Sequence, residues 1–120
     1  MKLGIVVNSK VALDEFLKKD LPIGMSWDVK VLIQKLNPEL TSYEDLRMDL
    51  IKKYGEQKEG TDQIQVKIEN LKVFFEELAV LQEKEIEVLL PEVKVSKLRK
   101  IEGFKMNTDD LLQLDWLIKE

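Results

Sequence analysis

The sequence predicts an α+β fold that is mostly helical: a long kinked helix in a hairpin, a small two-stranded sheet and a C-terminal helix. Apolar residues recur at helical spacing over most of the chain, and two short segments alternate apolar and polar residues, as half-buried strands do. With 120 residues, 44 % of them apolar, the chain is long enough for one core. No change in composition marks a boundary, so we expect a single domain over residues 1–120.

The first helix is expected over residues 9–19. Asn8 or Ser9 can cap it, because a short polar side chain can accept a hydrogen bond from the free N–H groups of a helix start. Pro22 disfavours helical backbone in the residue before it and ends the segment. The apolar face of this helix consists of Ala12, Leu13, Phe16 and Leu17.

The longest periodic segment runs from Ser26 to Tyr54. Its apolar stripe repeats every seven residues, at Val29, Leu36, Tyr43 and Leu50. Such a stripe packs either within the chain or against a second copy as a coiled coil. We favour packing within the chain and therefore a monomer, with a coiled-coil oligomer as the alternative.

Pro38 interrupts the long segment, and a proline inside a helix removes one backbone hydrogen bond. The segment is therefore either two helices with a break at this point or one helix with a kink. The apolar stripe stays in phase across Pro38. We therefore favour a kink.

Residues 64–68 and 85–90 alternate apolar and polar positions, and a helical segment over 69–82 separates them. A strand–helix–strand order suits a parallel pair, so we expect these two strands to pair. Residues 55–62 are expected to form a polar loop. The intervening helix is expected to bury Leu71, Phe74, Phe75, Leu78 and Leu81.

The last part of the chain predicts two short helical segments. A turn of helix is expected over residues 97–101. Thr108 opens the final helix, since acidic residues in a first turn suit the positive end of the helix dipole. Its apolar residues are Leu111, Leu112, Leu114, Leu117 and Ile118.

The chain has no histidine and no cysteine, which removes the commonest general base, the commonest transition-metal ligand and all thiolates. Its five glycines form no phosphate-binding loop. We therefore expect a protein that is not an enzyme, with no catalytic residue, no cofactor and no metal. The unfavoured alternative is a carboxylate-metal enzyme using Asp109, Asp110 and Asp115, although acids in a first turn are ordinary helix-capping chemistry.

The formal net charge of −4 opposes sequence-independent binding to phosphates. Residues 91–105 are locally basic, with five basic residues against two acidic ones. We interpret this stretch as a solvated connection and expect no strong nucleic acid binding. No apolar segment is long enough to cross a bilayer, so we expect a soluble protein with no membrane partner.

Trp27 and Trp116, with Met25 beside the first of them, are the candidate protein-binding residues. Tryptophan is enriched at the residues that dominate binding energy in protein interfaces. Trp27 stands at the start of the long stripe, and Trp116 lies off the strongest apolar row of the last helix. Each could instead close an edge of the core, but we expect at least one indole to be exposed.

Short segments over most of the chain follow a recognisable order: Met1–Leu3, Asn8, Ala12–Leu13, Phe16–Leu17, Leu21–Pro22, Leu50–Glu56, Phe75–Leu78, Glu85–Val88 and Asp110–Leu114. In this order the chain resembles an uncharacterised family of small proteins encoded by tailed phages and prophages of Gram-positive bacteria. The resemblance implies a phage origin, a small α+β fold and no active site. It also implies a location in the cytoplasm of the infected bacterial host or in the virion. Pro38 departs from the uninterrupted long helix expected for this family.

The sequence therefore predicts a non-enzymatic phage protein that acts through protein–protein interaction. We expect a role in virion structure or assembly, with a phage structural protein as the partner. The alternative is a host-directed inhibitor that binds a bacterial enzyme or an anti-phage defence complex.

Overall fold

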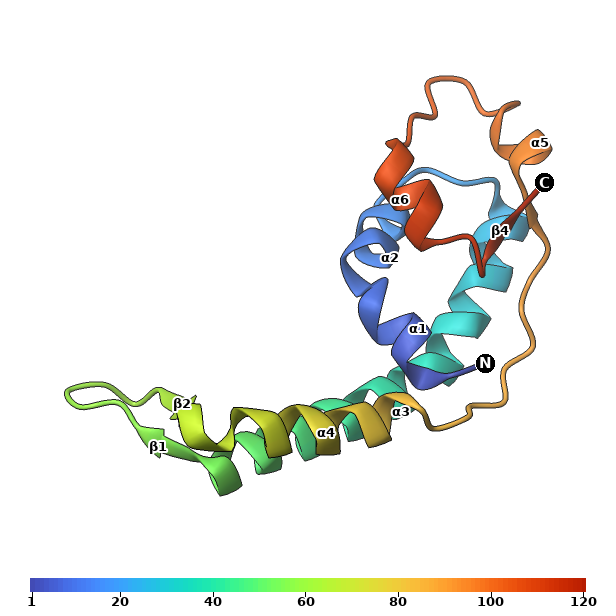
Figure 1. Cartoon of the computed structure of the whole chain (residues 1–120). Coiled ribbons are helices and arrows are strands. Elements are labelled where there is room, and N and C mark those ends of the chain that lie inside the picture. Colours follow the sequence, from blue (N-terminus) through green and yellow to red (C-terminus); the bar gives the residue numbers. More distant parts are fainter.

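The computed structural model describes residues 1–120 and divides into a body and an arm that projects from it (Figure 1). The arm, residues 39–84, holds the C-terminal half of α3 (Ile23–Tyr54), β1 (Gly55–Gln57), β2 (Ile64–Val66), the 3-10 turn η1 (Ile68–Asn70) and α4 (Leu71–Gln82). The body, residues 1–38 and 85–120, holds α1 (Leu3–Asn8), α2 (Lys10–Leu17), the N-terminal half of α3, β3 (Val93–Lys94), α5 (Val95–Leu98), α6 (Thr108–Gln113) and β4 (Ile118–Lys119).

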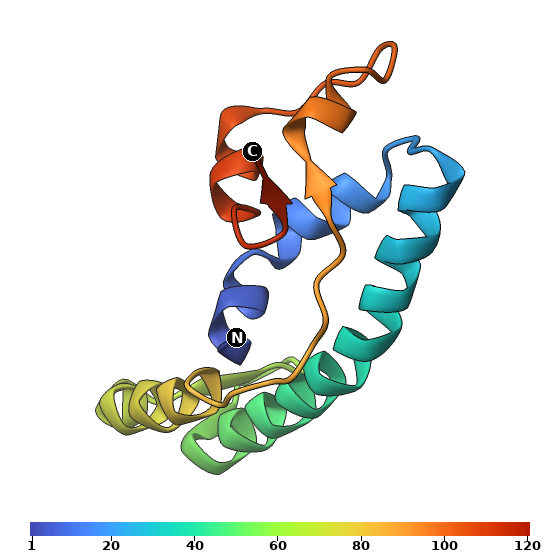
Figure 2. The same ribbon diagram turned by 90° about the vertical axis from the view of Figure 1, so that its right-hand side faces the viewer.

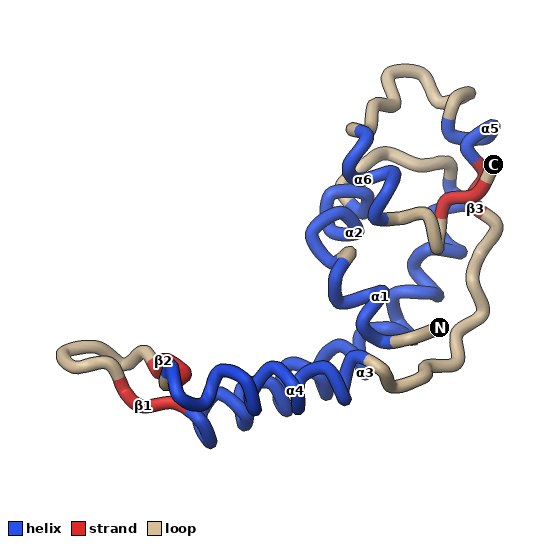
Figure 3. Tube along the Cα trace, viewed as in Figure 1, coloured by secondary structure: helices blue, strands red, loops and turns tan.

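The molecule is elongated, with extents of 52 × 31 × 22 Å and a radius of gyration of 17.6 Å. A compact domain of this length would have a radius of gyration of about 14 Å. Figure 3 shows that helices dominate both parts, and that the strands lie near the end of the arm and beside α5. No helix combines the length and the apolar character that a membrane crossing requires.

The first helical region differs from the expected 9–19 helix. It consists of α1 and α2, which meet at Ser9, and α1 begins already at Leu3. Ser9 does not cap α2 with its side chain. Its hydroxyl instead donates to the carbonyl oxygens of Ile5 and Val6 in the preceding turn, at 2.9 and 3.1 Å. The apolar run at the N-terminus is therefore helical because it packs on the body, with Leu3 and Val6 buried.

The long helix forms as one continuous element, α3, with Pro38 inside it. It begins at Ile23, directly after Pro22, and not at Ser26. Figure 2 shows that α3 changes direction along its length, so that its first half belongs to the body and its second half to the arm. Val29, Leu36 and Tyr43 of the apolar stripe are buried within the chain.

The predicted pairing of strands is wrong. β2 pairs antiparallel with β1, with Gly55 opposite Val66 and Gln57 opposite Ile64, so a strand lies in the expected polar loop. A hairpin closes a short loop, which costs less chain entropy than a crossover through a helix. Residues 85–90 do not form the expected strand and make one isolated bridge, between Glu85 and Lys2.

The structure has a parallel pair in another place, where Val93 of β3 lies opposite Ile118 of β4. α6 ends at Gln113, so Ile118 belongs to a strand and not to the predicted final helix. α6 begins at Thr108, as expected, and its cap is Asn107, whose side chain accepts a hydrogen bond from the backbone N–H of Asp110 at 2.8 Å. The expected helical turn forms as α5, earlier than 97–101.

The core lies in the body, between α1, α2, the first half of α3 and the C-terminal segment. Its largest fully buried side chains are Phe16, Leu13, Leu32, Leu36, Leu114, Leu117, Val6 and Val93. The arm buries little beyond Tyr43 and Phe74. Phe75 was expected to point inward but is 58 % exposed, because Phe74 occupies the side of α4 that meets α3.

Candidate protein-binding surface

The two tryptophans have opposite environments. Trp27 on α3 is 61 % exposed, whereas Trp116 is 7 % exposed. The expectation that at least one indole is exposed is therefore confirmed, by Trp27. Trp116 is a core residue, and a partner could not contact its ring without opening the body.

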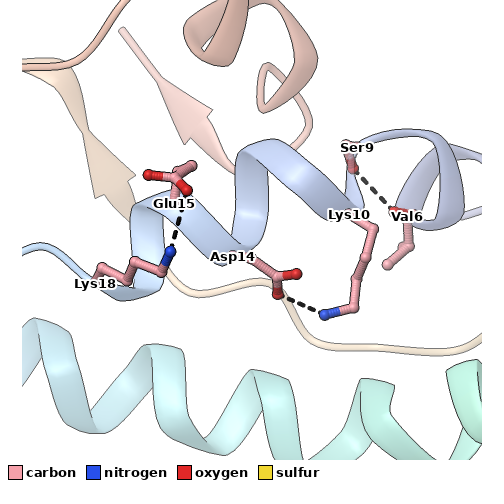
Figure 4. A network of polar contacts seen from close by, with 6 residues as sticks. All are labelled: Val6, Ser9, Lys10, Asp14, Glu15 and Lys18. Atoms are coloured by element: carbon pink, nitrogen blue, oxygen red, sulfur yellow. Dashed lines mark hydrogen bonds and ion pairs between the residues drawn. The ribbon is translucent and has the colours of Figure 1, made fainter.

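Trp116 is held by a buried polar contact. Its Nε1–H donates to the hydroxyl oxygen of Ser9 at 3.0 Å. Ser9 lies at the α1–α2 junction, where Figure 4 shows its contact with Val6 beside the ion pairs of α2. An indole N–H needs such a partner when it is buried. The sequence placed Trp116 off the strongest apolar row, but it could not show that Ser9 lies beside it.

Met25 does not support Trp27 from behind. It is half-buried and packs against the core. Residues two apart on a helix point to different sides, so Met25 and Trp27 cannot share a face. Met25 therefore anchors the start of α3 to the body, while Trp27 points outward.

Trp27 belongs to an apolar ridge that we define as Ile23, Trp27 and Val31. These residues are four apart, so they stand one above another on the outer side of α3. Their exposures are 87 %, 61 % and 38 %. Sequence reasoning missed Ile23 and Val31, although their one-turn spacing from Trp27 is visible in the sequence.

An apolar groove of about 390 Å³ runs along one side of the ridge, between α3 and the chain that links α2 to α3. Its apolar walls are Leu17, Leu21, Val29 and Ile33. Lys30 also borders the groove, and its Nζ lies 5.1 Å from the centroid of the Trp27 ring. Groove and ridge therefore form one continuous surface that meets at Lys30.

A second, more polar hollow of about 480 Å³ lies on the other side of the ridge, between the start of α3 and the α5 region. Asp28 lines it from α3, and Lys97 and Lys100 line it from the α5 region. Glu92 also lines this hollow but pairs with Lys94 at 2.8 Å. The Lys94 ammonium lowers the pKa of Glu92, through its hydrogen bond first and its charge second.

Four lysines around the ridge have no carboxylate within ion-pair distance: Lys19, Lys30, Lys97 and Lys100. Lys19 and Lys30 line the groove, and Lys97 and Lys100 line the polar hollow. The nearby acids that also lack an ion pair are Asp20, Asp28 and Glu102, and Glu102 lines a hollow together with Lys19, Asp20 and the unpaired Lys105. The surface therefore combines an exposed apolar crest with a net positive rim.

A second exposed aromatic residue lies on the arm. Phe75 of α4 is about as exposed as Trp27 and follows Leu71 by one helical turn. Neither the groove nor the polar hollow adjoins it, and its ring packs edge-on against Phe74, with centroids 5.2 Å apart. We therefore use Phe75 as the matched comparison for Trp27.

The acidic residues that a metal enzyme would require are not grouped. No three carboxylates of the chain come together in a set that could hold a metal ion. Asp109 and Asp110 lie in the first turn of α6, where their charge stabilises the helix start. These positions are accounted for by helix capping.

Comparisons with protein families, with curated proteins and with solved structures give no match for this chain.

Proposed function

We propose that this chain is a non-enzymatic protein that binds another protein through the apolar ridge on α3. The observation that carries the proposal is the exposure of Trp27 at the centre of that ridge, beside an apolar groove. A tryptophan that is covered on binding removes on the order of 150–250 Å² from water. Contiguous exposed apolar patches are uncommon on monomeric proteins and mark interaction sites.

The finer proposal concerns the partner. The resemblance described above supports a phage origin, with a phage structural or assembly protein as the partner. An elongated molecule with a projecting arm suits a part of an assembly, because its two ends can reach different neighbours. The alternative partner is a host enzyme or defence complex, and the experiment below separates the two.

The test is a quantitative pull-down from infected host lysate with three tagged baits: the wild-type chain, Trp27→Ala and Phe75→Ala. Phe75→Ala is the matched control, because it removes an equally exposed aromatic residue from the arm. We expect portal, tail or scaffold subunits to bind the wild type and the Phe75→Ala bait. We expect Trp27→Ala to weaken this binding by about 30-fold, the equivalent of roughly 2 kcal/mol.

Capture of a host enzyme in the same Trp27-dependent pattern would overturn the phage structural partner and support the host-directed alternative. Binding that Trp27→Ala leaves unchanged would remove the ridge as the binding surface. Circular dichroism of each bait checks that the fold is retained, and exposure of both side chains makes a loss of fold unexpected.

A further inference from the structure

We infer that the partner presents an acidic amphipathic helix to the ridge, with apolar residues on one face and carboxylates beside them. This inference rests on the proposed function and adds the chemistry of the partner. It is carried by the shape of the ridge and groove, and by the lysines without ion pairs that border them.

The shape favours a helix as the bound element. Ile23, Trp27 and Val31 are spaced by one helical turn, so a second helix laid along α3 can meet all three residues with its own residues at positions i, i+4 and i+8. The adjoining groove has apolar walls from Leu17 and Leu21 and is open along α3. Such a groove accepts the apolar face of an amphipathic helix.

The charge around the ridge favours carboxylates on the bound helix. Four lysines border the ridge without an ion pair, and Lys105 is a fifth at the hollow that holds Asp20. The unpaired acids on the same surface are three, Asp20, Asp28 and Glu102. The chain as a whole is acidic, and residues 39–84 of the arm hold eleven acidic and seven basic residues. The positive rim is therefore a local departure from the average charge, placed where the apolar surface is exposed.

The lysines lie on both sides of the ridge, which fixes how the carboxylates must be arranged. Lys19 and Lys30 stand at the groove, and Lys97 and Lys100 stand across the ridge from them. A helix with an apolar stripe flanked on both sides by glutamates matches this order. Complementary charge of this kind raises the association rate and selects among partners.

Nucleic acid is the other polyanion that exposed lysines and an indole could bind. The apolar groove has no counterpart in a phosphate backbone. Asp28 and Glu92 in the polar hollow act on phosphates and on glutamates alike, so the distinction rests on the apolar groove. The surface therefore fits an acidic peptide better than a nucleic acid strand, and the experiment includes both.

The test uses two synthetic helical peptides with the same stripe of leucines and phenylalanine, one flanked by glutamates and one by lysines. Neither peptide contains tryptophan, so the emission of Trp27 reports binding, while Trp116 is buried in the body. We expect the glutamate peptide to bind at least tenfold more tightly than the lysine peptide. We also expect its affinity to fall as salt is raised.

Two double variants locate the charge preference. K97E/K100E removes the positive side of the polar hollow and is expected to lower the affinity for the glutamate peptide by about tenfold. The matched control is K52E/K58E, which changes the net charge equally at two arm lysines without ion pairs and is expected to leave binding unchanged. Isothermal titration calorimetry gives the affinities independently of fluorescence.

Equal binding of the two peptides with Trp27 still required would overturn the acidic helix and leave the proposed function in place. Loss of binding to the same extent in both double variants would also overturn it, because a general effect of net charge would then explain the preference. Displacement of the glutamate peptide by micromolar single-stranded oligothymidylate would favour nucleic acid instead. Peptide binding that is unchanged in Trp27→Ala would count against the ridge itself and so against the proposed function.

Discussion

At the scale of single residues, the hydroxyl group of Ser9 connects the N-terminal helices to the C-terminal segment. It is 2 % exposed, and its oxygen accepts the indole N–H of Trp116 while its proton goes to the turn of α1 before it. Serine hydroxyls can both donate and accept, and both capacities are used here. The contact therefore fixes the end of the chain against the junction of α1 and α2.

Replacing Ser9 with alanine is expected to lower the free energy of unfolding by about 1–3 kcal/mol. The substitution leaves the buried N–H of Trp116 without a partner, and the cost of a buried unsatisfied donor falls in that range. Urea denaturation followed by far-UV circular dichroism measures the change. Ser96→Ala is the control, since Ser96 is exposed and makes no side-chain hydrogen bond in the structure, and an equal loss in both variants would contradict the assignment.

The two tryptophans show what the sequence can and cannot predict about the exposure of a single residue. The sequence identified both as candidates for a surface, and its composition could not distinguish them. Burial of Trp116 depends on Ser9, more than one hundred positions away, and no local pattern encodes that contact. Trp27, by contrast, has Ile23 and Val31 at one-turn spacing, so the sequence shows that the three residues share a helix face, while their exposure comes from the structure.

At the scale of elements, the crossing of α1 with α4 is the contact that joins the arm to the body. A Cβ placed on Gly4 would lie 2.9 Å from the Cβ of Gln82 and 3.0 Å from its carbonyl oxygen. The two backbones therefore approach as closely as they do because residue 4 has no side chain. The backbone N–H of Leu3 donates to the carbonyl of Lys84 at 2.8 Å and extends this junction.

Gly4→Ala is expected to destabilise the protein by about 1–3 kcal/mol, since overpacking forces the two helices apart. Gly24→Ala is the matched control, because residue 24 is also helical and a Cβ there meets nothing within 4 Å. That control should be neutral or stabilising by up to about 1 kcal/mol, from the helix propensity of alanine. Thermal unfolding measures the melting temperature of both variants. Equal melting temperatures for Gly4→Ala and Gly24→Ala would refute the close approach of the two backbones.

Helices and strands were predictable where the spacing of apolar residues follows the face that each element buries. α2, α3 and α4 were all expected near their observed positions, because each presents an apolar face to a neighbour. The sheet was mispaired because β1 is Gly-Glu-Gln, a polar strand that gives no apolar signal. Residues 85–90 alternate because Ile86 and Val88 pack on the body, so their alternation reports burial without a partner strand.

At the scale of the whole molecule, the apolar stripe of α3 is used within the chain, by the body in its first half and by α4 in the second. Val29, Leu36 and Tyr43 are buried, and the hydroxyl of Tyr43 accepts a hydrogen bond from Gln82 of α4 at 3.1 Å. A coiled coil with a second copy would need the same residues. We therefore retain the prediction of a monomer.

Small-angle X-ray scattering at several micromolar concentrations tests shape and mass together. We expect a constant mass near 14.0 kDa and a radius of gyration of at least the 17.6 Å of the Cα trace. A radius near about 14 Å would mean that the arm folds back on the body. A mass that rises with concentration would support association between copies.

The division into arm and body also sets an order of events during synthesis. The arm is one continuous stretch and is complete once residue 84 has been added, whereas the body needs β4 and Trp116 to complete its core. At 5–20 residues per second, the ribosome takes roughly 2–7 s to add that last stretch. During those seconds Leu13 and Phe16 of α2 lack the cover that α6 and the C-terminal segment later provide, so the nascent chain offers chaperones an apolar helix that the finished protein conceals.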